Sequence, residues 1–401
     1  MKKILMASCL LAATAFAQWG GPQSSGGVPN TDKTADVNYA GDGKAHHTLD
    51  IYIPKEAKES YPVVIHTYGS AWSMNNMKGS ADLNTICAAY AKAGYAVVTP
   101  NHRSASDAIY PAQLHDIKAV VRFVRGNAAK YKFDTTFIAV SGFSSGGHLS
   151  SLTATTCGLK EGKSGSVTVD LVGNLGEFTS YSSCVDGAVL WSPPTDIYTM
   201  NPISMGGSGT MEGKFIGVER EGNKDKWMVA SSPYYASEDD PPVIIFHGTS
   251  DQVVNIEQSQ ELYDSLKNHN VVTEFIKVSG GQHGGDVMYA SANLDKAVAF
   301  LNKAREAKAA AVVVPPDTSV ADTSKVDTSK TDTLPPDTET IAIHSLRVPM
   351  LAPVSYSVYS LDGTLVMRSS VLDKSRLKAG VYYVVSKYNT GERKMSRFVK
   401  K

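Results

Sequence analysis

Short runs of apolar and β-branched residues, each closed by glycine or small polar residues, recur along the first 300 positions of this 401-residue chain. Such runs are typical of buried β-strands. The clearest are residues 62–67, 95–98, 137–140, 242–248 and 273–278. Helices are expected between several of them, after residue 110 and from residue 147 onward. The pattern predicts a main domain, which we place at residues 45–308, in which strands and helices follow one another.

The pattern changes after residue 310. Asp-Thr pairs recur every five residues from Asp317 to Asp337, and a Pro-Pro pair stands directly before the first and before the last of them. A polar, proline-bearing run of this kind cannot bury a core, so residues 309–340 are expected to form an extended linker. Alternation returns in residues 356–366 around an Asp-Gly pair, which is a hairpin signal. Residues 341–401 are therefore predicted to form a small β module.

The chain begins with a basic residue pair, an apolar stretch over residues 4–16 and the small-x-small sequence Ala15-Phe16-Ala17. This order is that of a signal peptide, so we expect residues 1–17 to be removed by cleavage after Ala17. The apolar run is too short to span a membrane. Residues 18–44 are then an N-terminal extension, and the protein is expected to be secreted or held at the cell surface.

The sequence Gly142-Phe143-Ser144-Ser145-Gly146 stands between the predicted strand at 137–140 and the helix expected from residue 147. A bare G-x-S-x-G motif is frequent by chance. The order strand, motif, helix is more informative, because it is that of a nucleophile elbow, a tight turn that exposes a serine hydroxyl at the edge of a sheet. Ser144 is therefore the predicted nucleophile.

A nucleophilic serine needs a base and a carboxylate that orients the base, and in this architecture the acid precedes the histidine. Asp251 follows the predicted strand at 242–248, and His283 lies in a glycine-rich loop after the next strand. We predict a triad of Ser144, Asp251 and His283. Asp251 could instead cap a turn, in which case Asp264 or Asp286 would be the competing acids.

The loop Tyr68-Gly69-Ser70-Ala71-Trp72 follows the predicted strand at 62–67. Small side chains allow backbone amides to approach a substrate carbonyl closely, as an oxyanion hole requires. The residue after the nucleophile normally supplies a further amide. The predicted donors are the backbone N–H groups of Ser145, Ser70 and Ala71.

These ordered elements resemble the α/β-hydrolase family, and within it the carbohydrate-acting esterases related to acetylxylan and feruloyl esterases and to hormone-sensitive-lipase-like enzymes. The resemblance covers about residues 45 to 305 and includes Asn101-His102-Arg103, Trp191-Ser192-Pro193-Pro194 and Ser232-Pro233-Tyr234-Tyr235. It implies an α/β fold with a mostly parallel central sheet flanked by helices. The esterase form of the 68–72 loop is a histidine followed by glycines, so Tyr68, Ser70 and Ala71 depart from that form.

The resemblance also implies two-step acyl transfer from an ester, with acetyl or feruloyl groups on a plant polysaccharide such as xylan as the expected substrate. Tyr68, Trp72 and Trp191 would then line the acyl or sugar site, or serve equally as core aromatics. Prolyl oligopeptidase-like peptidases share the triad, but the chain has no room for their large N-terminal propeller. A non-catalytic binding protein on the same fold would usually lack a triad residue.

The C-terminal module resembles sorting or attachment domains of exported proteins from cellulolytic and gliding bacteria, on the stretches Leu361-Asp362-Gly363 and Ala379-Gly380-Val381-Tyr382-Tyr383. This likeness implies contact with the cell surface or with export machinery. A carbohydrate-binding or spacer module is the alternative.

Composition and cysteines narrow the picture further. With 39 basic and 39 acidic residues, no charge excess indicates nucleic acid or an acidic membrane surface as a partner. No Cys/His spacing suits zinc, and neither a metal nor a cofactor is expected. Removal of the signal leaves three cysteines, an odd count. Cys87 is expected to be a buried free thiol, while Cys157 and Cys184, which flank a polar excursion, could be bonded or free.

Overall fold

The computed structural model describes residues 27–79, 82–203 and 209–313 and, near the C-terminus, the strands within residues 355–400. The chain divides into two compact units, Met1–Glu306 and Ala307–Lys401. The predicted signal peptide and most of the predicted linker lie outside the described residues.

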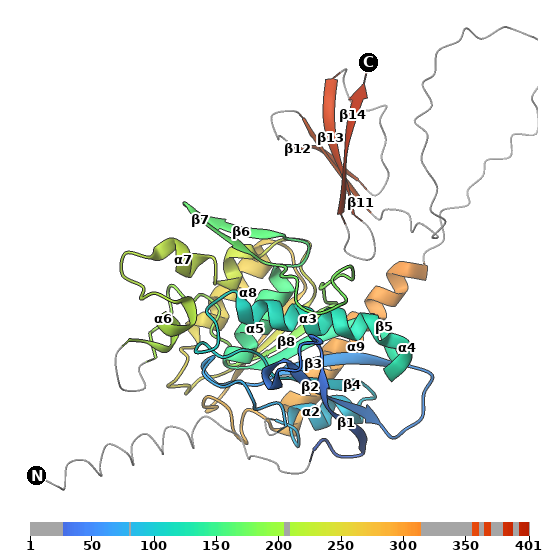
Figure 1. The fold of residues 1–401 in the computed structure, drawn as a ribbon, viewed down its shortest axis with the longest axis vertical. Helices are drawn as coiled ribbons and strands as arrows, with labels where there is room; N and C mark the ends of the chain where they lie inside the picture. Colours follow the sequence, from blue (N-terminus) through green and yellow to red (C-terminus); the bar gives the residue numbers. More distant parts are fainter. Residues whose placement is uncertain are drawn as a thin grey trace, which may run out of the picture. The chain divides into compact units, whose positions relative to one another are not determined.

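The first unit is built on an eight-stranded sheet with the order β1-β2-β4-β3-β5-β8-β9-β10 (Figure 1). From β4 to β10 all neighbouring strands pair in parallel, and only β1 and β2 run antiparallel to their neighbours. The mostly parallel sheet expected from the sequence is thus confirmed. The strands are β1 (Thr31–Asn38), β2 (Thr48–Pro54), β3 (Tyr61–Thr67), β4 (Ala96–Pro100), β5 (Phe133–Phe143), β8 (Gly187–Trp191), β9 (Val243–Gly248) and β10 (Thr273–Val278).

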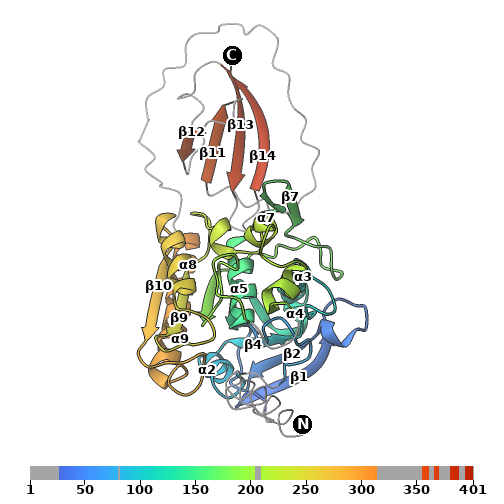
Figure 2. The ribbon, with the colours of Figure 1, turned by 90° about the vertical axis from the view of Figure 1, so that its left-hand side faces the viewer.

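Two apolar layers cover the sheet, because successive residues of a strand point to opposite faces. Val63 belongs to the layer that includes residues of α3, α5 and α8, whereas Val64 belongs to the layer that includes residues of α2 and α9. The two faces are therefore covered by different helices (Figure 2). The helices are α2 (Ile86–Lys92), α3 (Ala112–Gly126), α4 (Ala128–Tyr131), α5 (Ser145–Thr155), α6 (Met211–Ile216), α7 (Lys224–Met228), α8 (Glu257–Asn268) and α9 (Ser291–Val313), with the 3₁₀ helices η1 (Ala45–His47) and η2 (Ser232–Tyr235).

The boundaries of the main domain differ from those predicted. Strand β1 pairs antiparallel with β2, so part of the predicted 18–44 extension belongs to the sheet. Its sequence is polar and mostly exposed, as an edge strand permits, and so carries little apolar signal. Helix α9 also continues past residue 308 to Val313. The alanines around position 310 are strong helix formers and explain this extension.

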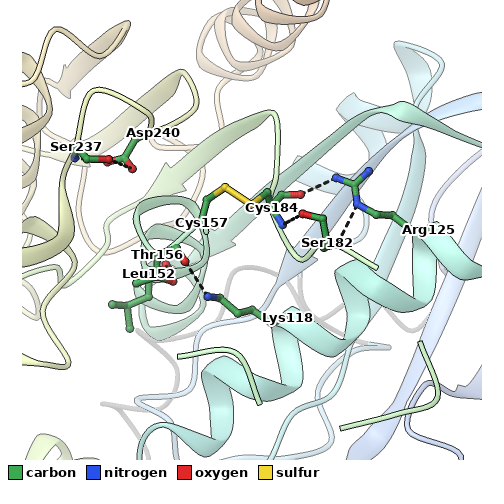
Figure 3. Close-up of a disulfide and its surroundings, with 9 residues drawn as sticks. All are labelled: Lys118, Arg125, Leu152, Thr156, Cys157, Ser182, Cys184, Ser237 and Asp240. Carbon is green, nitrogen blue, oxygen red and sulfur yellow. Dashed lines mark hydrogen bonds between the residues drawn. A yellow bond between two sulfur atoms is a disulfide. The ribbon is translucent and has the colours of Figure 1, made fainter. Parts of the chain in front are cut away.

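The polar excursion after α5 contains a two-stranded hairpin, β6 (Glu161–Ser164) with β7 (Val167–Asp170). A disulfide between Cys157 and Cys184 closes this excursion (Figure 3). Arg125 of α3 donates to the carbonyl oxygen of Cys184 at 2.7 Å, which fixes one end of the bridge. Cys87 is free and buried, as predicted, and burial raises the pKa of its thiol.

The second unit contains a four-stranded antiparallel sheet with the order β12-β11-β13-β14. Its strands are β11 (Ser355–Ser360), β12 (Leu365–Ser369), β13 (Gly380–Lys387) and β14 (Arg393–Lys400). The predicted hairpin is present as the β11–β12 pair, although the Asp-Gly turn itself lies outside the described residues. Across the described part of both units, no helix is long and apolar enough to span a bilayer.

Candidate active site

Ser144 occupies a sharp turn between β5 and α5, with φ 53° and ψ −124°. This conformation is strained for a residue with a side chain. Two glycines of the motif make the turn sterically feasible. A Cβ atom at Gly142 would overlap the carbonyl oxygen of Gly146, and one at Gly146 would overlap the carbonyl oxygen of Thr67. The local geometry is that of a nucleophile elbow.

Ser144, His283 and Asp251 lie in one hydrogen-bonded row. The Oγ atom of Ser144 is 2.8 Å from Nε2 of His283, and Nδ1 of His283 is 2.8 Å from Oδ2 of Asp251. The three residues follow β5, β10 and β9, and parallel strands bring their carboxyl ends to the same edge of the sheet. The row matches the geometry that proton transfer from a serine to a histidine requires.

The two competing acids lie elsewhere. Asp264 is on the exposed side of α8, where its carboxylate accepts a hydrogen bond from Gln260 at 2.8 Å. Asp286 is also exposed. Because Nδ1 of His283 already faces Asp251, the structure gives neither alternative a part in the row.

Asp251 caps a turn and faces His283 with the same carboxylate. Its Oδ1 atom accepts from the backbone N–H groups of Val253 and Val254, at 2.9 and 3.0 Å. Its Oδ2 atom faces both His283 and Nε2 of His247, the latter at 3.2 Å. Burial alone would raise the pKa of Asp251, but the hydrogen bonds from His247 and His283 outweigh it and hold that pKa well below its usual range.

His247, which was not among the residues predicted from the sequence, is fully buried near the end of β9. Its Nε2 atom lies 2.9 Å from the carbonyl oxygen of Val254, and its Nδ1 atom lies 2.6 Å from Oγ of Ser259. A carbonyl oxygen can only accept, so Nε2 carries the proton and Nδ1 accepts from the serine. The N–H at Nε2 of His247 also faces Oδ2 of Asp251, 3.2 Å away. Its position four residues before Asp251 was the available signal.

Of the three predicted oxyanion donors, the amide of Ser70 has another hydrogen-bond partner, and those of Ser145 and Ala71 remain candidates. Ser145 is the first residue of α5, and an N–H group in the first turn of a helix has no acceptor within that helix. The N–H group of Ser70 instead donates to Oγ of Ser145 at 2.8 Å. The Ser70 amide is thus directed at a side chain, contrary to the expected role. Ala71 remains a predicted donor.

Gly69 is a further candidate donor, beyond the three predicted from the sequence. A Cβ atom on Gly69 would lie 2.8 Å from Cβ of Ser144 and 2.7 Å from the ring of Phe143. The backbone of Gly69 therefore passes directly against the nucleophile, at a distance that only glycine permits. Gly69 is the one glycine of the 68–72 loop, and this was the feature of the sequence that could have indicated so close an approach.

The three aromatic residues predicted to line a pocket are almost fully buried in the core. Trp72 stacks on Phe215 with ring centroids 4.6 Å apart, and Trp191 stacks on Phe246 at 4.2 Å. Tyr68 donates through its hydroxyl to a backbone carbonyl at 3.1 Å. The pocket role is therefore wrong for these side chains, and the alternative role as core aromatics holds.

Two sizeable cavities occur among the described residues. One of about 740 Å³ is lined by residues around α7, and one of about 630 Å³ by residues that include Ser73, Ala105 and Met211. Neither is lined by a triad residue. Among the residues that the structure describes, no cluster of three or more His, Cys, Asp or Glu side chains could hold a metal ion.

A mostly parallel sheet that carries a Ser–His–Asp row at the carboxyl ends of its strands defines an α/β-hydrolase fold with a serine-hydrolase site. Residues 49–266 match the BD-FAE family, and the chain belongs to this family. Membership of the α/β-hydrolases, with carbohydrate esterases among the structural neighbours, agrees with the resemblance seen in the sequence.

Solved structures carry the likeness further. A truncated carbohydrate esterase from gut microbiota is 40% identical, with a TM-score of 0.67, over 70% of this chain and 99% of that chain. A bifunctional GH43-CE protein of Bacteroides eggerthii is 42% identical, with a TM-score of 0.65, over 68% of this chain and 35% of that one.

Curated relatives are more distant. The probable carboxylic ester hydrolase LipM of Mycobacterium tuberculosis is 27% identical over 238 residues, which is 58% of this chain and 51% of that protein. Esterase LipQ of the same organism is 24% identical over 258 residues, 64% of this chain and 58% of that protein. The chain thus spans about half the length of these curated relatives.

Proposed function

We propose that this protein is a secreted serine esterase that removes acyl groups, acetyl or feruloyl, from a plant cell-wall polysaccharide such as xylan. The observation that carries the proposal is the row of two 2.8 Å contacts that joins Ser144, His283 and Asp251. The similarity to a carbohydrate esterase over nearly the whole of that chain supports the substrate class.

The reaction begins with proton transfer. Nε2 of His283 accepts the proton from Oγ of Ser144 while Oγ attacks the ester carbonyl carbon. The negative charge that develops on the carbonyl oxygen is stabilised by the Ser145 amide and by amides of the loop after β3. His283 then gives the proton to the sugar oxygen as the bond between that oxygen and the acyl carbon breaks, which releases the sugar hydroxyl and leaves the acyl group on Ser144. A water molecule, activated by the same histidine, releases the acid.

Asp251 makes this histidine a competent base. Its carboxylate accepts from Nδ1–H of His283, which leaves Nε2 unprotonated and aimed at Ser144. Because its pKa is held below the usual range, the carboxylate stays charged in mild acid and stabilises the imidazolium that forms during attack. His247 contributes by holding the carboxylate in place.

A polysaccharide substrate also fits the expected organisation of the chain. A signal peptide, a linker and a terminal β module would place the catalytic unit outside the cell and beside a polymer. The terminal module would attach the protein to the cell surface or engage export machinery. An acylated polysaccharide or oligosaccharide is the proposed partner.

The test compares acid released from acetylated xylan with acid released from feruloylated arabinoxylan, using Ser144→Ala as the inactive control. Release from at least one polymer, absent in the control, is the expected result. Turnover of a soluble aryl ester without release from either polymer would reject the polysaccharide substrate. Cleavage of a proline-linked peptide in place of any ester would reject the esterase assignment.

A further inference from the structure

We infer that the side chains of Ser145 and His148, which lie three residues apart on α5, are positioning residues that hold the loop of residues 69–72 against the nucleophile. The inference rests on the proposed esterase function, since the loop matters there as a source of oxyanion donors. It assigns a task to the side chain of Ser145 that is separate from the task of its backbone amide.

Two hydrogen bonds join the loop to the helix. The backbone N–H of Ser70 donates to Oγ of Ser145 at 2.8 Å, and Nε1–H of Trp72 donates to Nδ1 of His148 at 3.2 Å. Helix positions three residues apart lie on the same face, so one face of α5 contacts the loop at both Ser70 and Trp72. The bonds are buried, which strengthens them relative to exposed ones.

His148 is itself fixed in the form that accepts this bond. Its Nε2 atom lies 2.8 Å from the carbonyl oxygen of Ala230, so Nε2 carries the proton and Nδ1 is left as an acceptor. Burial lowers its pKa to about 4, so the ring is neutral at physiological pH. The indole of Trp72 is further held by its stack on Phe215 and its edge contact with the ring of His148.

The loop needs such restraint because its backbone is unfavourable. Ala71 and Trp72 have φ values of 48° and 56°, in the left-handed region that residues other than glycine rarely adopt. Residues held there persist only when surrounding contacts impose the conformation. Since α5 starts directly after Ser144, a loop bonded to its first and fourth residues keeps a fixed distance from the nucleophile.

The experiment uses Ser145→Ala and Trp72→Phe, which each remove one of the two bonds and leave the main-chain amides in place. Ser150→Ala is the matched control for the first, since Ser150 is buried on the same helix and makes no hydrogen bond through its hydroxyl within the described residues. Trp227→Phe is the control for the second. Trp227 is buried in the same apolar cluster as Trp72, and its indole N–H donates to the carbonyl oxygen of Val218 at 3.1 Å, outside the 69–72 loop.

Two measurements are made on each full-length variant: steady-state hydrolysis of an aryl acetate, and amide hydrogen exchange of a peptide spanning residues 66–75. Ser145→Ala and Trp72→Phe should each lower kcat by about 10- to 100-fold with KM changed less than about twofold, as expected when the oxyanion donors act mainly on the transition state. Their exchange in the 66–75 peptide should be faster than in wild type. The double variant should lose less than the product of the two single effects. Both controls should behave as wild type.

Unchanged exchange in Ser145→Ala and Trp72→Phe would overturn the inference whatever the activity. Faster exchange with unchanged kcat would reject the catalytic part of the inference. A rise in kcat for Ser145→Ala would also overturn it, because Oγ would then be competing with the oxyanion for the Ser70 amide. Absence of ester hydrolysis by the wild-type protein would reject the proposed function instead. The exchange measurement would still decide whether the two hydrogen bonds to α5 hold the loop.

Discussion

The carboxylate of Asp251 is held by four groups, the amides of Val253 and Val254 and the rings of His283 and His247. The loop of residues 69–72, with its proposed oxyanion donors, forms the oxyanion side of the site and is held differently. Two of its residues have left-handed backbone conformations, and it donates two hydrogen bonds to side chains of α5, the helix that follows the nucleophile. The acid side of the site, which is Asp251, is therefore fixed by contacts made at one side chain. The oxyanion side is fixed by contacts spread over several residues of a loop.

This difference has a mechanistic consequence. A charged group that receives several hydrogen bonds tolerates the loss of one, since the others keep its position. A strained loop whose contacts are spread over several residues depends on each of them to keep its backbone in place, so the loss of one shifts the backbone amides it carries. Substitutions around Asp251 should therefore alter charge and proton transfer, while substitutions around the loop should alter geometry.

The largest effect is expected from Ser144→Ala, which removes the atom that both sides of the site serve. Activity on a soluble aryl ester should fall by about 10⁴- to 10⁶-fold. Within the described residues the hydroxyl makes one hydrogen bond, with His283, so the melting temperature should stay close to that of wild type. More than a few per cent residual turnover in a folded variant would show that another group is the nucleophile.

Asp251→Asn tests the acid side alone. The amide cannot hold His283 in the tautomer that accepts the serine proton, so kcat should fall by about 10⁴-fold with KM little changed. Asp264→Asn and Asp286→Asn are matched controls at exposed positions and should keep wild-type rates. Inactivity in either control, with Asp251→Asn active, would mean that the acid has been misplaced.

The pKa of Asp251 also makes a prediction about stability. An aspartate in an unfolded chain titrates at about 3.9, and in the folded protein the pKa of Asp251 is held well below that value. A lowered pKa in the folded state gives stability that is complete above the unfolded value and is lost as the pH falls toward the folded one. The difference in unfolding free energy between wild type and Asp251→Asn should be present at neutral pH and shrink below about pH 4. Urea titrations at several pH values measure it. A difference that vanished near neutrality would contradict the assignment.

The same contrast explains which parts of the site could be predicted from the sequence. Ser144, Asp251 and His283 each follow a short apolar strand, and the order of strands in a parallel sheet brings such positions together. Local pattern and topology were therefore enough to place them. The direction of the Ser70 amide depends on Oγ of Ser145, which is 75 positions away in sequence, so no local pattern indicates it.

Burial was the other limit. Trp72 and Trp191 carry the same sequence signal whether an aromatic ring lines a pocket or packs beneath it. Their stacking on Phe215 and Phe246 is a tertiary contact between distant segments. Edge strand β1 was missed for the opposite reason, because its polar sequence contains no apolar pattern and only pairing with β2 defines it.

The disulfide allows the comparison to be checked at a distance from both sides of the site. Cys157→Ser removes a crosslink that closes a separation of 27 residues, and chain entropy predicts a loss of about 3 to 4 kcal/mol in unfolding free energy. Because the bridge lies beyond the far end of α5 from Ser144, kcat at 25 °C should change less than about twofold. Cys87→Ser is the control for loss of a thiol outside the bridge. A large fall in kcat would mean that the excursion controls the position of α5, and with it both sides of the site.

The smallest effect on chemistry is expected from removal of the second unit. All residues of the acid side and of the oxyanion side belong to the first unit, and a chain that ends after Val313 keeps α9 whole. This endpoint is preferable to Lys308, because a cut there would remove the last turn of the helix. Turnover of a soluble aryl ester by the shortened chain should equal that of the full chain within about twofold. If the C-terminal module serves attachment, retention on cells or on insoluble xylan should fall while soluble turnover stays intact. Insolubility of the shortened chain, or a loss of soluble turnover together with retention, would show that the first unit depends on the second and that residues beyond 313 contribute to the active site.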